Sequence, residues 1–211
     1  MPKTKIIKID SQKPEKEEIK KIAQKLKKGG LIIFPTDTLY GLGGNALNKN
    51  IVKKIFNLKK RPTSKPISIN IAYKKDLKKY VKKIPTSAKK LIKEFWPGPL
   101  TIIFEKSKII PNELTGGSPY IGVRIPDNKI TLEIIKKSGL PLTSPSANLS
   151  GKKPPTTAKQ TKKDFLNKVN IIIDGDETTT KEGSTIIDLS KEKSLILREG
   201  AIPIKKLKKF I

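Results

Sequence analysis

The sequence predicts an α/β protein made of a single domain, residues 1–211, with one twisted sheet that mixes parallel and antiparallel strands and is flanked by helices. Segments with apolar residues at helical spacing alternate with short apolar runs that are typical of buried strands. The chain closes with strand after strand, which predicts an antiparallel part of the sheet. No internal repeat or low-complexity linker divides the 211 residues, which are enough for one sizeable core.

The first helix is predicted to open with the Glu-rich run at 15–18, with Ile19, Ile22 and Leu26 on one face, and to end before Gly29. The same spacing predicts further helices at 48–58, 76–82, 86–95, 129–137, 157–169 and 203–211. Apolar runs or two-residue alternation predict strands at 31–34, 66–72, 100–104, 120–125, 141–143, 170–174, 184–189 and 194–198. We expect the last two strands to pair, and we expect the motif-bearing core to run from about residue 15 to residue 200.

The composition excludes several kinds of chemistry. The chain has no Cys and no His, so it has no Cys or His zinc site, no cysteine nucleophile, no Ser-His-Asp triad and no disulfide. No apolar run reaches the ~18 residues that a membrane span needs. Residues 1–10 lack the apolar stretch of a secretory signal. We therefore expect a soluble cytoplasmic protein that does not associate with a membrane.

The formal net charge is +27, and it comes from 43 lysines and only three arginines, Arg61, Arg124 and Arg198. One interpretation is a solvated lysine surface that follows from compositional drift toward AT-rich codons. The other is an electrostatic surface for nucleic acid. Composition does not separate the two, and the arginines are more informative because the chain otherwise avoids that residue.

Five loops carry Gly, Pro, Ser, Thr or Arg among lysines and isoleucines: 34–43, 59–66, 96–101, 120–126 and 143–151. The first holds hydroxyls and a carboxylate directly after a buried strand, where open α/β sheets bind ligands. The second holds four cations stiffened by prolines, which suits a polyphosphate, although an exposed basic turn has the same composition. The fifth holds four hydroxyls and an amide, which suit either a small polar ligand or ordinary turn chemistry.

Arg124 lies inside an apolar strand, where an unpaired charge costs several kcal/mol in desolvation. It therefore needs an anionic partner, which is either a structural carboxylate or the carboxylate of a ligand. The local sequence does not distinguish these two partners.

Together the runs FPTDTLYGLG, K-x-R-P, WPGPLT, VRIP, SPSANLSG, STIIDL and LREG resemble the threonylcarbamoyl-AMP synthase family (Sua5/YrdC/TsaC) in order and spacing, from residue 31 to residue 200. The resemblance implies a YrdC-like fold in its short, single-domain form. It also implies that L-threonine, bicarbonate or CO₂ and ATP are condensed to threonylcarbamoyl-AMP and pyrophosphate. This product serves the threonylcarbamoyladenosine modification of tRNA, through a downstream threonylcarbamoyl-transferase complex.

The resemblance also implies a set of site residues. Its threonine pocket corresponds to Thr38, Asn70, Arg124, Ser144 and Ser184. Its ATP site corresponds to Arg61, Lys65, Tyr120, Ser146, Pro154 and Arg198. Lys59 and Arg61 match the family's cations at the reacting phosphates, so both are assigned catalytic roles. Many relatives carry His at the position of Asn70 and Glu at that of Asp37.

These roles fit the chemistry of the residues. A threonine carbamate must attack the α-phosphorus in line with the departing pyrophosphate, a step that needs positioning and charge neutralisation more than a proton relay. We expect Mg²⁺ to be held mainly by ATP phosphates, with no metal site made of protein residues alone. The alternative function is a non-catalytic module that binds double-stranded RNA or tRNA. The low aromatic content of 5% makes that alternative weaker.

Overall fold

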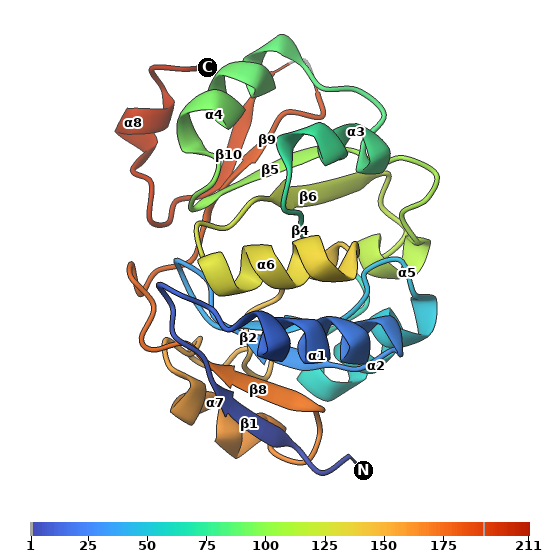
Figure 1. Ribbon diagram of the computed structural model, residues 1–211. Helices are drawn as coiled ribbons and strands as arrows, with labels where there is room; N and C mark the ends of the chain where they lie inside the picture. Colours follow the sequence, from blue (N-terminus) through green and yellow to red (C-terminus); the bar gives the residue numbers. More distant parts are fainter. Residues whose placement is uncertain (1, 192) are drawn as a thin grey trace.

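The computed structural model describes residues 2–191 and 193–211 (Figure 1), so Met1, where the expected domain begins, lies outside the described residues. The helical elements are α1 (Lys16–Lys27), α2 (Lys49–Lys59), the 3-10 turn η1 (Lys74–Asp76), α3 (Leu77–Tyr80), α4 (Thr86–Phe95), α5 (Asn112–Thr115), α6 (Lys129–Ser138), α7 (Ala158–Phe165) and α8 (Ile204–Leu207). The strands are β1 (Lys5–Lys8), β2 (Ile32–Phe34), β3 (Gly41–Gly43), β4 (Ile69–Asn70), β5 (Leu100–Glu105), β6 (Tyr120–Arg124), β7 (Leu142–Thr143), β8 (Ile171–Asp174), β9 (Thr185–Asp188) and β10 (Leu195–Arg198). Among the described residues, no helix is both long enough and apolar enough to cross a membrane.

The predicted mixture of parallel and antiparallel strands flanked by helices is confirmed, but the described strands form two sheets where the sequence predicted one. Their orders are β1-β8-β2-β3 and β10-β9-β5-β6-β4-β7. The predicted pairing of the last two strands is also confirmed, because β9 and β10 run antiparallel. The sheets meet where β3 approaches β7: Thr143 N donates to Gly44 O over 3.0 Å, and Gly44 N donates to Thr143 Oγ1 over 3.1 Å.

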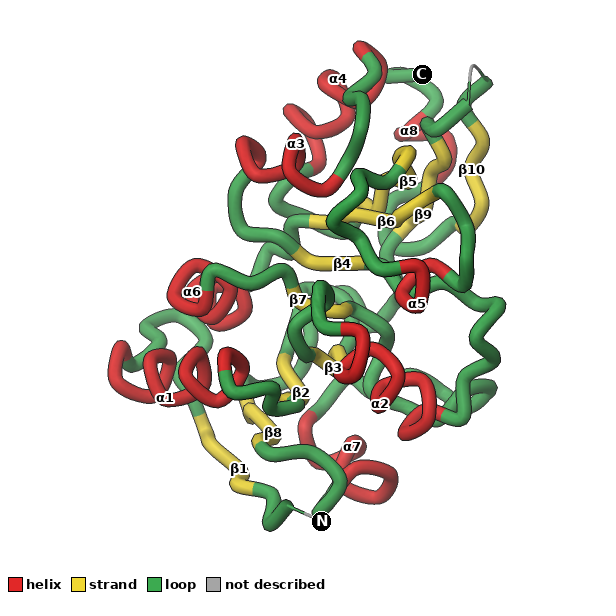
Figure 2. Tube along the Cα trace, turned by 90° about the vertical axis from the view of Figure 1, so that its right-hand side faces the viewer, coloured by secondary structure: helices red, strands yellow, loops and turns green. Residues whose placement is uncertain are grey.

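The four-stranded sheet is covered on both faces. On one face of the sheet, Ile32 and Phe34 of β2 belong to a hydrophobic cluster with residues of α1 and α6. On the other face, Ile33 belongs to a separate hydrophobic cluster that includes residues of α2 and α7. In Figure 1, α1 and α6 lie side by side, and Figure 2 shows α1 on the opposite side of this sheet from α2 and α7. Because this sheet is buried on both faces, its central strands are continuous apolar runs, as the sequence showed.

The six-stranded sheet has helices on one face only. Leu100, Ile102 and Phe104 of β5 pack in the same cluster as residues of α3, α4 and α8, which lie with this sheet in the upper part of Figure 1. Residues at alternate positions, such as Thr101 and Ile103, point to the other face, because successive side chains of a strand alternate. Within residues 2–191 and 193–211, no helix covers that face, where Thr101, Ile103 and Gly122 line a cavity shared with loops of the four-stranded half.

Strand β3 was not predicted, since its glycines were assigned to a loop. It pairs antiparallel with β2, with Gly41 opposite Phe34 and Gly43 opposite Ile32. A Cβ atom on either glycine would lie 2.7 Å from the Phe34 ring. Glycine is therefore needed at both positions to let the backbone of β3 lie against that ring.

Candidate active site between the two sheets

A cavity of about 690 Å³ lies between the uncovered face of the six-stranded sheet and the loops of the four-stranded half. All three arginines of the chain line it, and none of the described residues on its lining is a lysine. The residues predicted from sequence that the structure places on this lining are Thr38, Arg61, Arg124, Ser144, Ser146, Pro154, Ser184 and Arg198. Residues far apart in the sequence thus meet in one cavity.

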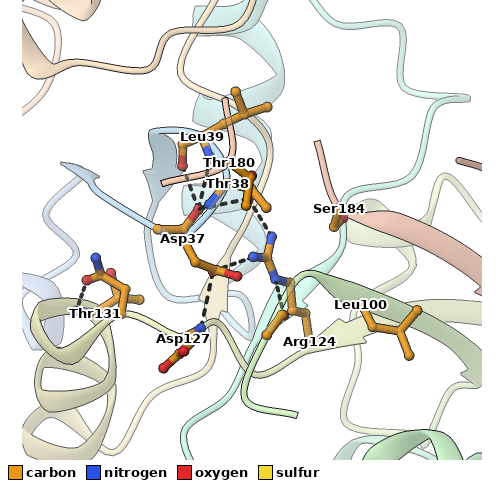
Figure 3. Close-up of polar contacts among 12 residues, drawn as sticks. Asp37, Thr38, Leu39, Leu100, Arg124, Asp127, Thr131, Thr180 and Ser184 are labelled. Atoms are coloured by element: carbon orange, nitrogen blue, oxygen red, sulfur yellow. Dashed lines mark hydrogen bonds and ion pairs between the residues drawn. The ribbon is translucent and has the colours of Figure 1, made fainter. Parts of the chain in front are cut away.

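Arg124, the last residue of β6, is held from three sides. Its Nε donates to Gly98 O over 2.9 Å, its Nη1 donates to Thr38 Oγ1 over 2.7 Å, and its Nη2 forms an ion pair with Asp37 (Figure 3). The two charged side chains are only 6% and 9% exposed. The sequence left open which anionic group pairs with Arg124, and the structure shows that Asp37 provides a structural carboxylate for it. Since a guanidinium has five N–H donors, two of them are not used in these contacts.

The Asp37 carboxylate also holds the turn after β6, because its Oδ1 accepts a hydrogen bond from Asp127 N over 3.2 Å. Burial raises the pKa of the Asp37 carboxyl, and the nearby Arg124 guanidinium opposes that rise. The pair joins the loop after β2 to the six-stranded sheet. It therefore fixes Arg124 at the boundary between the two halves of the cavity.

Ser184 and Arg198 form a second polar group on the lining. Ser184 Oγ lies 2.8 Å from Thr101 Oγ1, and Arg198 Nη2 donates to Ser184 O over 2.7 Å and to Ser184 Oγ over 3.2 Å. Burial lowers the pKa of Arg198. The backbone is closely packed here, because a Cβ atom on Gly200 would lie 2.1 Å from Gly183 O. These contacts hold the Arg198 side chain against the start of β9.

Arg61 lines the cavity just beyond α2. Asn48 caps the start of this helix by accepting from Asn50 N and Ile51 N, and Lys60 ends it in the left-handed conformation at φ 48°. The Arg61 side chain donates from Nε to Lys65 O and from Nη2 to Pro66 O, both over 2.9 Å. The proline-bearing turn therefore orients the guanidinium, as the sequence suggested for this basic cluster.

Lys59 lies next to the cavity but is not part of its lining. It is 2% exposed, and its Nζ donates to Ser146 O over 2.5 Å and to Asn148 O over 2.6 Å. Burial is the main reason why its pKa falls to about 8, and the positive charge of Arg61 contributes.

Three other residues assigned from sequence also lie off the lining. Asn70 is fully buried beside Arg124, its neighbour in the register of β4 and β6, and neither polar atom of its side chain has a hydrogen-bond partner among the described residues. Lys65 is exposed, and it contributes its main-chain carbonyl to Arg61. Tyr120 is half-buried at the start of β6.

The lining also includes residues that the sequence did not indicate: Thr36, Ser68, Thr101, Gly122, Glu182 and Glu199. Strand alternation could have indicated Thr101, since it lies between Leu100 and Ile102, which face the core. Gly122 has a steric role, because a Cβ atom there would lie 3.1 Å from both Ser68 Cβ and Thr101 Cγ2. With three guanidinium groups and two carboxylates, the lining has a net positive charge and many hydroxyls, which suits an anionic, oxygen-rich ligand.

Several known proteins resemble this chain in sequence and in fold. The threonylcarbamoyl-AMP synthase of Pyrococcus abyssi is 44% identical over 93% of this chain, and the chain spans 58% of that protein's length. A putative threonylcarbamoyl-AMP synthase of Methanocaldococcus jannaschii is 44% identical over 97% of both chains. The crystal structure of P. abyssi Sua5 complexed with L-threonine superposes with a TM-score of 0.96, at 43% identity, over 99% of this chain and 61% of that one.

A family model for Sua5, YciO and YrdC proteins, described as telomere recombination, matches residues 24–200. These residues include every candidate site residue discussed above, from Thr38 to Arg198. The match covers most of the chain, so this protein belongs to the Sua5/YciO/YrdC family.

Proposed function

We propose that the chain is an L-threonylcarbamoyladenylate synthase, a nucleotidyltransferase that condenses L-threonine, bicarbonate or CO₂ and ATP to threonylcarbamoyl-AMP and pyrophosphate. The observation that carries the proposal is the meeting of all three arginines on one hydroxyl-rich cavity. The names of the two relatives that are 44% identical support it. We further propose that residues 1–211 act as a single domain, which the match over 97% of the M. jannaschii protein supports.

The threonine half of the cavity is proposed to lie around Arg124. Its unused N–H groups suit the threonine carboxylate, and the hydroxyls of Thr38, Ser144 and Ser184 suit the ammonium and hydroxyl groups. P. abyssi Sua5, which is 43% identical, has been crystallised with L-threonine, and this supports threonine as a ligand of this chain. Asn70 is buried beside Arg124, and its amide has no hydrogen-bond partner within the described part of the chain, so we propose that it also serves the threonine half.

The ATP half is proposed to lie between Arg61 and Arg198, with Ser146 and Pro154 on the same lining. Lys65 and Tyr120, also assigned to ATP from sequence, lie off the lining, and we propose that they contact ATP from the edge of the cavity.

The threonine amine would first add CO₂ to form a carbamate, releasing a proton. A carbamate oxygen would then attack the α-phosphorus as the bond to pyrophosphate breaks. Fixed guanidinium groups favour this step because they neutralise the charge that develops on the phosphate oxygens.

Magnesium is proposed to accompany ATP. No group of three or more His, Cys, Asp or Glu side chains that could hold a metal ion occurs within residues 2–191 and 193–211. The donor set therefore fits an ion held mainly by phosphate oxygens, with Glu182 and Glu199 as the carboxylates that the cavity offers. When bound, the ion would neutralise charge on the departing pyrophosphate.

The proposed partners are tRNA and the downstream threonylcarbamoyl-transferase complex that would consume the product, and a cytoplasmic location follows from them. The exposed lysines make binding to double-stranded RNA the rival function. Such binding would weaken steeply with added salt, because it depends on phosphate contacts. The cavity favours the enzyme, since its arginines face inward and most lysines face solvent.

The test is to measure pyrophosphate release from ATP with threonine and bicarbonate added together and left out one at a time. We expect release only when all three substrates are present. Release that does not depend on threonine would contradict the proposal. Tight RNA binding at physiological salt without the three-substrate reaction would favour the rival.

A further inference from the structure

The K-x-R spacing places two cations on different sides of one turn. Helix α2 ends at Lys59, and Lys60 reverses the chain in the left-handed conformation. Arg61 then lines the cavity, whereas Lys59 is buried behind it. A side chain that lies off the lining acts on a bound ligand through the residues that it holds.

Lys59 holds one loop at three points. Its ammonium group donates to the main-chain carbonyls of Ser146 and Asn148, and its own carbonyl accepts from Ser150 N over 2.9 Å. No carboxylate lies within ion-pair distance of Lys59 among the described residues. It is also the only buried lysine in the described part of the chain. A buried ammonium without an ion pair is costly, so the carbonyl contacts stabilise it there, and the negative charge of Asp164 contributes.

The other edge of the same loop is held by β3 and by Tyr40, the residue before it. Leu42 N donates to Pro145 O over 2.9 Å, and Ala147 N donates to Tyr40 O over 2.7 Å. Ser146 lies between these two anchors and lines the cavity. The position of Ser146 therefore depends on the contacts of Lys59 and on the main-chain hydrogen bonds to Tyr40 and Leu42.

We propose that Lys59 is a positioning residue that fixes Ser146 against the cavity by holding the carbonyls of Ser146 and Asn148. This inference rests on the proposed function, because that function assigns Ser146 to the ATP half of the cavity. It replaces direct contact of Lys59 with the reacting phosphates, which the family resemblance implied. Removing the Lys59 ammonium would let the loop move while the charge on the lining stays unchanged.

A double-mutant cycle tests the proposal: the Kd for ATP is measured for the wild type, Lys59→Met, Ser146→Ala and the double variant. We expect each single substitution to weaken ATP binding on the order of tenfold and the double variant to be little weaker than Ser146→Ala. Lys54→Met, at an exposed position of the same helix, is the matched control and should change the Kd less than twofold. Additive losses would mean that Lys59 acts on ATP independently of Ser146, which overturns the proposal.

One further measurement and one replacement variant keep the test decisive. Amide hydrogen exchange at residues 147–150 should speed up in Lys59→Met and not in Lys54→Met, whether or not nucleotide binds; unchanged protection would overturn the positioning role. If Lys59→Met does not fold, Lys59→Gln takes its place. The failure of the proposed function itself is separate, since it would show as the absence of threonine-dependent pyrophosphate release by the wild type.

Discussion

The buried ion pair between Asp37 and Arg124 predicts a large effect of Asp37→Asn. The substitution keeps the shape and one acceptor oxygen but removes the one negative charge that contacts the Arg124 guanidinium among the described residues. With side chains only 6% and 9% exposed, the unpaired charge gains little from solvent. Removing one partner of such a pair typically costs roughly 3–5 kcal/mol. Because Asn still accepts a hydrogen bond, we expect the lower end, about 3 kcal/mol of unfolding free energy.

The assay is equilibrium unfolding in urea, with Asp127→Asn as the matched control. Asp127 is exposed, and only its main-chain N–H contacts Asp37, so its substitution should change stability by no more than about 0.5 kcal/mol. A saturating threonine concentration should stabilise Asp37→Asn more than the wild type, because the ligand carboxylate would then be the only anionic partner of Arg124. Equal unfolding free energies for the two variants would refute the reasoning that Arg124 depends on Asp37.

Three further predictions follow from other contacts. Arg124→Ala should weaken threonine binding at least tenfold and leave nucleotide binding largely intact, as calorimetric titration would show; equal loss of both ligands would mean that its role is misassigned. Since burial lowers the pKa of Lys59 to about 8 from 10.5, the unfolded chain binds more protons between these values. The wild type should therefore gain stability relative to Lys59→Met as the pH rises from 8 to 10.5, by up to about 3 kcal/mol, and a difference that does not change with pH would contradict this. Tyr40→Phe removes a hydroxyl that donates to Asp176 O over 2.6 Å and accepts from Gly175 N over 3.1 Å. In thermal unfolding it should lower the free energy of unfolding by about 1–3 kcal/mol. The control Tyr73→Phe, at an exposed site, should leave the free energy of unfolding almost unchanged.

The elements whose signals are local could be predicted from the sequence. Helix α2 is one example: its apolar face and the Asn48 cap lie within the helix or next to it. Strand β3 could not be predicted, because its glycines are explained by the ring of Phe34, which only the folded sheet brings against them. The division into two sheets depends in the same way on long-range pairing between strands, which no local pattern contains.

The candidate site shows the same limit. Eight of the lining residues could be assigned from the sequence through the family resemblance, and they include Pro154 and Arg61, which follows a helix. Local patterns alone indicated only loops with hydroxyls and arginines, several of them at strand ends, where ligands bind in open α/β sheets. The contribution of Asp37 to Arg124 could not be read from the sequence, since the two residues lie 87 positions apart. Lys59 and Arg61 have the same spacing in the sequence whether they point together or apart, and only the left-handed turn at Lys60 shows that they separate.

The lack of lysine on the described cavity lining has a chemical consequence for the proposed reaction. Threonylcarbamoyl-AMP is an activated acyl group, and a neutral amine beside it would attack it and become modified irreversibly. A guanidinium attracts the same phosphates but stays protonated, so it does not act as a nucleophile. Lys59, whose pKa of about 8 would make it a reactive amine at neutral pH, has its nitrogen bound to two carbonyls behind the lining. The cavity thus provides positive charge that its own product cannot acylate.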